Sequence, residues 1–145
     1  MVTHQNATPT VGSMPSRRGA DQAYRLLRTV FTIAPIAFGA DKFAEVLTDW
    51  DQYLAPRLND LIPGSSHQTM LMVGVVEILA GVLVALRPRW GGYVVALWLA
   101  GIIANLLILG DFYDVALRDF GLLVAALALA RLASDGSGGA GAWRS

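Results

Sequence analysis

The 145-residue chain has 54 % hydrophobic residues, 15 % charged residues and a mean hydropathy of +0.50. A soluble domain carries roughly 25 % charged and 45–50 % apolar residues, so this chain is too apolar for that class. Its 11 basic and 11 acidic side chains give zero net charge, which argues against a nucleic-acid partner, because nucleic-acid binding needs a basic patch. The absence of cysteine excludes disulfides, iron–sulfur clusters and thiolate nucleophiles. The class that remains is an integral membrane protein.

The chain opens with a polar segment and continues into an apolar one. Residues 1–20 are rich in Ser, Thr, Pro and Gly and contain no apolar signal sequence, so we predict a disordered cytoplasmic tail. The first apolar block covers residues 24–47, with its most apolar part at 29–40. Pro35 predicts a kink in this helix but no break, because a neighbouring group in a membrane bundle can satisfy the freed carbonyl.

The segment 48–64 is too long for a tight turn, and its apolar and polar residues alternate at roughly helical spacing. We expect it to lie along the outer membrane surface, either as a structured loop or as a lid over the bundle. Its apolar residues would then face lipid or the bundle: Trp50, Tyr53, Leu54, Leu58 and Leu61.

Three further apolar blocks follow at residues 68–86, 90–109 and 115–133. Each is close to the ~20 residues that a helix needs to cross a hydrocarbon core of ~30 Å. None alternates with period two, so helices are predicted and barrel strands are not. The expected organisation is an all-α, four-helix transmembrane domain at 21–134, followed by a disordered Gly-rich tail at 135–145.

The arginines predict the orientation of this bundle. Eight of them fall on one side of a four-span chain: Arg17, Arg18, Arg25, Arg28, Arg87, Arg89, Arg131 and Arg144. The other side has Arg57 together with five aspartates. Because cytoplasmic loops carry an excess of arginine and lysine, both termini are predicted to be cytoplasmic.

Small residues recur at helical spacing on three of the predicted helices. Such residues let helix backbones approach closely in a membrane, and we expect seams within the bundle rather than a dimer interface. They are Gly74 and Gly81, then Gly92, Ala96, Ala100 and Ala104, and finally Gly121 and Ala125.

Seven polar or ionisable residues lie inside the predicted spans. A charge at the centre of a bilayer costs roughly 2.5–3.5 kcal/mol on insertion scales, so such residues persist where they face one another or a wet cavity. A rise of ~1.5 Å per residue places them near the midplane or in the outer half of the bundle. The candidate ligand-binding residues are therefore Asp41, Lys42, Glu45, Glu77, Asn105, Arg118 and Asp119.

Helical spacing predicts that these side chains share one interior. Asp41 and Glu45 are four residues apart and should lie on one face, with Lys42 beside Asp41. Arg118 is expected to face inward with the small residues of its helix. The set contains two cations, Lys42 and Arg118, and four acids, so two acids are left without partners. Glu77, the deepest acid, is expected to be protonated because burial disfavours a charged carboxylate.

Three roles for this cluster remain open on the residues alone. It could fix the register of the helices, it could bind a polar headgroup or a quinone ring, or it could conduct protons or ions. A conduction path is disfavoured, because the inner half of the bundle offers no relay residues. The sequence has no spacing that suits a metal site and no hydrolytic triad, so we name no metal ligands and no catalytic residues.

The residues also carry a family resemblance. The stretch Gly39-Ala40-Asp41-Lys42-Phe43, Glu77 followed by Gly81, and Leu117-Arg118-Asp119 resemble DoxX-type membrane proteins over about residues 22–133. The resemblance implies a four-helix bundle in a prokaryotic cytoplasmic membrane. Some relatives are subunits of quinone-linked oxidoreductases, including thiosulfate:quinone oxidoreductase and terminal quinol oxidase complexes. By that analogy the polar site would be lined by Lys42, Glu77, Arg118 and Asp119.

The sequence thus predicts an accessory subunit of a quinone-linked membrane redox complex, with no catalysis by the chain alone. Membrane lipid and other membrane subunits are the expected partners, and a quinone is the one cofactor considered. The alternative is a structural membrane protein, or a transporter of small molecules or ions, whose buried charges fix helix register or bind substrate.

Overall fold

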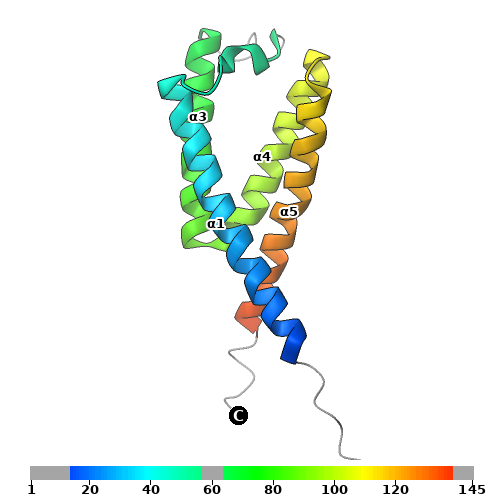
Figure 1. Cartoon of the computed structure of the whole chain (residues 1–145). Coiled ribbons are helices and arrows are strands. Elements are labelled where there is room, and N and C mark those ends of the chain that lie inside the picture. The colour runs from blue at the N-terminus through cyan, green and yellow to red at the C-terminus, as the bar shows by residue number, and fades with distance from the viewer. Residues whose placement is uncertain (1–13, 57–63, 139–145) are drawn as a thin grey trace, which may run out of the picture.

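The computed structural model describes residues 14–56 and 64–138, and this part of the chain is helical with no β-strand. It contains four long helices and one 3-10 turn: α1 (Met14–Ala44), η1 (Trp50–Tyr53), α3 (Ser66–Leu86), α4 (Pro88–Leu109) and α5 (Tyr113–Gly138). The long helices stand side by side and η1 lies across one end (Figure 1). We call this the η1 end and the opposite one, where residues 86–88 join α3 to α4, the turn end. The all-α prediction is confirmed.

Several predictions concern residues outside the described ranges. They are the tails over 1–13 and 139–145, and Arg57, Leu58 and Leu61 of the segment between the first two long helices. Helix α1 starts within the expected N-terminal tail, and α5 ends within the expected C-terminal tail. Both helices continue past the α3–α4 connection at the turn end (Figure 1).

Local sequence signals explain where the helices begin and end. The Ser65 hydroxyl accepts a hydrogen bond from the Gln68 amide while the Gln68 side chain accepts one from the Ser65 amide, so α3 starts with a capping box. Pro88 opens α4, where its missing N–H is not needed, and Gly110 closes it with φ of 77°. Helix α1 runs unbroken through Pro35, and the kink stays a prediction.

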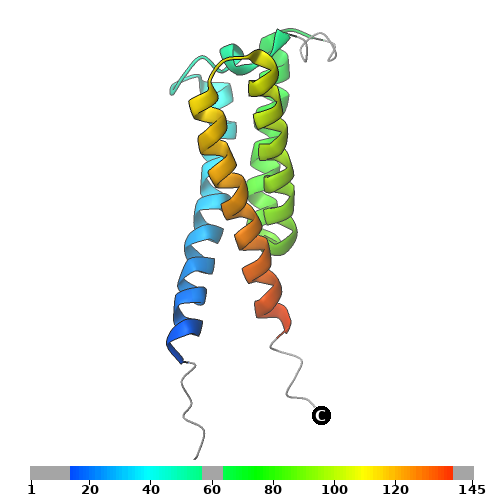
Figure 2. The same ribbon diagram turned by 90° about the vertical axis from the view of Figure 1, so that its right-hand side faces the viewer.

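The helices pack as two antiparallel pairs, α1 with α3 and α4 with α5 (Figures 1 and 2). In the first pair the backbones nearly touch. A Cβ on Gly39 would come within 2.5 Å of the Gly74 carbonyl oxygen, and one on Gly81 would lie 2.7 Å from the Thr32 carbonyl oxygen. In the second pair a Cβ on Gly92 would lie 2.8 Å from the Ala126 carbonyl oxygen.

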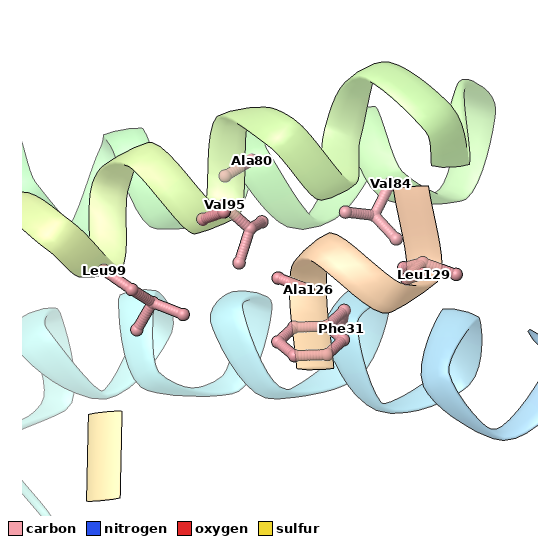
Figure 3. Packing of buried hydrophobic residues seen from close by; sticks show 8 residues of the cluster. Phe31, Ala80, Val84, Val95, Leu99, Ala126 and Leu129 are labelled. Atoms are coloured by element: carbon pink, nitrogen blue, oxygen red, sulfur yellow. The ribbon is translucent and has the colours of Figure 1, made fainter. Parts of the chain in front are cut away.

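A hydrophobic core joins the two pairs towards the turn end (Figure 3). Phe31 of α1 packs there against side chains of α3, α4 and α5, and Val84 and Leu129 are fully buried. The remaining members are Ala80, Val95, Ala96, Leu99 and Ala126. Towards the η1 end the pairs separate (Figure 1), and Asn105 of α4 is joined to the η1 segment by hydrogen bonds.

The prediction of small-residue seams is confirmed for one part and wrong for another. Gly74, Gly81, Gly92 and Ala96 are buried in the seams, as expected. Ala125 is partly buried against the core, whereas Ala100, Ala104 and Gly121 are exposed, and a Cβ on Gly121 would meet no atom of another element within 4 Å. On α4 the reason is helix geometry: each step of four residues turns by about 40°, so Ala100 and Ala104 rotate away from the face that Gly92 presents to α5.

The surface of the described residues carries many large apolar side chains. Large hydrophobic side chains are exposed on all four long helices, among them Leu26, Leu79, Leu97 and Leu117, each more than 60 % accessible. Helices α3 and α4 are long and apolar enough to cross a membrane, with mean hydropathies of 2.4 and 2.2. In α1 and α5 the apolar stretches are bounded more closely by charged residues.

The α1–α3 seam gives a testable consequence. Gly74→Ala places a methyl group against the Gly39 carbonyl oxygen, and overpacking of this kind costs about 1–3 kcal/mol. Gly121→Ala adds the same methyl group in open space and should be neutral or stabilising, because alanine favours the helix. Denaturation of both variants in detergent by titration with sodium dodecyl sulfate compares them, and equal losses of stability would contradict the seam.

Candidate functional site: a buried polar cluster

The centre of the site is an ion pair between α1 and α3. The Lys42 Nζ lies 2.7 Å from Glu77 Oε2, and the two side chains are only 4 % and 11 % exposed. Lys42 follows the Gly39 seam by one helical turn, and its Cβ lies 3.2 Å from the position that a Cβ on Gly74 would occupy. The close approach of the two helices therefore positions both partners of the pair.

Asp41, next to Lys42, binds the chain that leaves α1. Its carboxylate accepts hydrogen bonds from the backbone N–H groups of Val46 and Leu47, each at 3.2 Å, and from the Trp50 indole N–H at 2.8 Å. Glu45 has a left-handed backbone conformation with φ of 50°, which reverses the chain so that these amides point back. Asp41 thus satisfies backbone N–H groups of the segment that follows α1.

Trp50 contacts both Asp41 and Lys42. Its N–H binds Asp41, while its ring covers Lys42, with Nζ 3.8 Å from the ring centroid. A desolvated cation–π contact contributes about 2 kcal/mol, so the ammonium gains a second favourable neighbour besides Glu77. The Trp50 ring also packs edge-on against Phe38 of α1, at 6.1 Å between centroids.

Asn105 of α4 holds the same segment from the other helix pair. Its Nδ2 donates to the Tyr53 carbonyl oxygen at 2.6 Å, and its Oδ1 accepts from the Ala55 N–H at 2.9 Å. The Tyr53 ring lies 4.6 Å from that of Phe112, beyond the end of α4. The described part of the segment containing η1 therefore contacts both pairs at the end where they separate, and a lid formed by the whole segment stays a prediction.

A small pocket lies beside the ion pair. It has a volume of about 100 Å³ and is lined mainly by apolar side chains of all four helices, with Glu77 and Trp98 as its polar members. The Trp98 indole nitrogen is buried near the Glu77 carboxylate without reaching good hydrogen-bonding geometry. Asp119 of α5 is also buried.

This pocket is smaller than a closed cavity known to hold a six-membered ring. A cavity of about 150 Å³ admits benzene, whereas the pocket beside Glu77 has about 100 Å³. A quinone site in this chain therefore stays a prediction.

The structure brings together five of the seven candidate residues and separates the other two. Asp41, Lys42, Glu77 and Asp119 are buried, and Asn105 is partly buried. Their shared location is the region between η1 and the middle of the helices.

Glu45 and Arg118 do not join this group. Glu45 is exposed and contacts His67, with 3.1 Å between Oε1 and Nδ1, because the chain reversal at Glu45 ends the helical face shared with Asp41. The Arg118 side chain is 70 % exposed, so the inward orientation expected for it is wrong. Its Nε lies 4.0 Å from Asp119 Oδ1, at the limit of an ion pair. Adjacent helical positions differ by about 100°, and Asp119 takes the inward one.

The expected pairing within the cluster also needs correction. Glu77, which we expected to lack a partner, is the partner of Lys42, while the Asp41 carboxylate is stabilised by hydrogen bonds from uncharged N–H donors. Sequence reasoning placed Trp50 at the membrane surface and missed its contacts with Asp41 and Lys42. It also missed Trp98. Trp98 precedes Asn105 by seven residues, or about two helical turns, which places both on one face of α4.

Chemically, the cluster is largely saturated by its own members. Lys42, Asp41 and Asn105 each have protein partners at hydrogen-bonding distance. An arrangement of this kind fixes helices and a connecting segment relative to one another, and leaves no free base or nucleophile among these three side chains.

Comparison of the chain with protein-family models, with curated proteins and with solved structures gives no match. The similarity to DoxX-type proteins therefore stays a prediction, and the site is interpreted from its own geometry.

The ion pair can be tested by single and double replacement. Lys42→Met leaves a buried carboxylate without its partner, which costs about 3–5 kcal/mol, whereas Lys42→Met with Glu77→Leu removes both charges and should recover most of that loss. The free energy of unfolding in detergent measures each variant. Arg118→Gln is the control for an exposed charge and should change little. A double variant as damaged as the sum of its single variants would refute the coupling.

Proposed function

We propose that this chain is a four-span integral membrane protein that serves as an accessory subunit of a quinone-linked redox complex. The observation that carries the membrane assignment is the inverted distribution of side chains. Large apolar residues cover all four long helices, while Asp41, Lys42, Glu77 and Asp119 are buried. A membrane favours this distribution, because charged groups are tolerated there only when they face the interior of the bundle.

The proposed location is the cytoplasmic membrane of a prokaryote, with both termini in the cytoplasm. The charge of the two ends supports this orientation. Exposed arginines gather at the turn end: Arg18, Arg25, Arg28, Arg87, Arg89 and Arg131. The η1 end instead carries four aspartates: Asp49, Asp51, Asp111 and Asp114. Positive residues favour the cytoplasmic side.

The accessory role is supported by the saturation of the polar cluster. Lys42 and Glu77 join α1 to α3, and Asn105 joins α4 to the η1 segment, so these residues act as a lock on the bundle. In this proposal the redox chemistry belongs to partner subunits, and the chain presents its apolar helix faces to lipid and to those subunits. The DoxX resemblance provides the link to quinone-dependent complexes.

The second candidate is a structural protein or a transporter acting by itself. The pocket of about 100 Å³ beside Glu77 favours it, because a carboxylate there could contact a small ligand. The two candidates differ in what Glu77→Gln does: the lock predicts lower stability, and a substrate site predicts retained stability with lost activity.

The orientation can be tested in a chain that has no natural cysteine. In Gln52→Cys the new thiol lies in exposed η1, and in Asp21→Cys it lies near the start of α1. A membrane-impermeant maleimide added to intact spheroplasts should label the first variant, and the second only after lysis. The cysteine-free chain is the control. The reverse pattern, or labelling of both from outside, would contradict the proposed orientation.

The assignment as a subunit predicts stoichiometric partners. The tagged chain, isolated from its native membrane in mild detergent, should retain membrane subunits and quinone-dependent electron-transfer activity. Native mass spectrometry identifies the partners and their copy numbers. A chain that is isolated alone, with no partner and no quinone-dependent activity, would refute the accessory role.

A further inference from the structure

A second candidate site lies at the turn end, far from the polar cluster. A groove of about 390 Å³ runs along α1 beside the last turn of α3. Its lining changes from aromatic and cationic to apolar along α1, in the order Tyr24, Arg25, Arg28, Thr29 and Ile33, with Ala85 contributed by α3.

Arg28 is held in this groove by the end of α3. Its guanidinium donates a hydrogen bond of 2.6 Å to the Ala85 carbonyl oxygen, one of the last carbonyls of the helix, which lack intrahelical partners. A guanidinium has five N–H donors, and this bond fixes its position while using one of them. The fixed cation remains exposed to the groove.

Arg25 lies nearly one turn earlier on α1 and is also exposed. No acidic side chain among the described residues forms an ion pair with Arg25 or Arg28. Two exposed cations that form no ion pair among the described residues therefore line one groove. They are suited to an anionic group such as a phosphate, which arginine binds through several N–H donors at once.

The length and polarity of the groove match one end of a lipid. From Tyr24 to Ile33 the helix rises about 14 Å, at 1.5 Å per residue. The headgroup layer is about 5–8 Å thick on each side of the hydrocarbon core, so this length covers the layer and the first part of the acyl chains. The arginines lie at the headgroup level, and Ile33, which is 60 % exposed, lies on the acyl side.

We propose that this groove binds the headgroup of an anionic phospholipid, with its phosphate between Arg25 and Arg28 and its acyl chains along Ile33. Basic pockets between membrane helices on the cytoplasmic side are typical sites for such headgroups. The inference rests on the proposed membrane-spanning orientation. It assigns the site to a lipid rather than to free phosphate, because the groove continues from the cations onto an apolar surface.

Native mass spectrometry of the full chain in detergent, titrated with phosphatidylglycerol or phosphatidylcholine, tests the site. The wild-type chain should bind phosphatidylglycerol more tightly than phosphatidylcholine. Arg25→Gln should weaken phosphatidylglycerol binding about fivefold, and Arg25→Gln with Arg28→Gln about 25-fold, since each arginine near a membrane surface contributes about 1 kcal/mol. Arg25→Gln is the cleaner variant, because Arg28 also stabilises the end of α3.

Arg131→Gln is the matched control, since Arg131 is an exposed arginine of α5 that does not line the groove. Equal losses in Arg131→Gln and Arg25→Gln, or no preference of the wild-type chain for phosphatidylglycerol, would overturn the site. Displacement of phosphatidylglycerol by millimolar inorganic phosphate would overturn its assignment to a lipid.

A parallel extraction of membranes with alkaline carbonate separates this inference from the proposed function. A chain that stays in the membrane but binds both lipids equally refutes only the groove. A chain that carbonate releases refutes the membrane-spanning proposal itself.

Discussion

The structure depends on how closely α1 approaches α3. Gly39 and Gly74 leave no room for a side chain between the two backbones, and Lys42 lies against Gly74, from where its ammonium reaches Glu77. A buried ion pair is favourable only when its geometry is good and its remaining donors are satisfied. The glycine seam supplies the geometry, and the Trp50 ring shields the other side of the ammonium. Packing and electrostatics are therefore not separable at this helix crossing.

The position of the polar cluster follows from the shape of the bundle. Near the turn end the two helix pairs share a hydrophobic core around Phe31 and Val84, and apolar packing is sufficient there. Towards the η1 end the pairs separate, and hydrogen bonds to a connecting segment replace direct packing. Asp41 holds that segment from the first pair and Asn105 from the second. In a membrane such bonds have little competition from water, so a few of them can join elements that do not pack against each other.

Most of the fold could be predicted from the sequence, because apolar blocks, caps and glycines are local signals. The positions of α3 and α4, the seam glycines and the burial of Asp41, Lys42 and Glu77 all follow from spacing on a single helix. The partners could not be predicted, because they depend on how helices are rotated against one another. Arg118 and Asp119 are adjacent, and only the packing of α5 decides which one faces inward. Glu45 illustrates a second limit: spacing by four residues loses its meaning once the backbone leaves the helix.

The zero net charge of the chain conceals a difference in what the charges at its two ends can do. Near the η1 end, Lys42, Glu77 and Asp41 are used on one another or on nearby N–H groups, so their charge is not offered to the surroundings. At the turn end the arginines are exposed, and even Arg28, which holds the end of α3, uses a single donor for that purpose. The turn end therefore presents a basic surface although the composition is neutral, while the exposed aspartates of the η1 end make that end acidic. In the proposed orientation, the basic surface of the turn end would lie where a membrane presents its phosphate groups. The charge distribution that would orient the helices would then also favour anionic lipid around them.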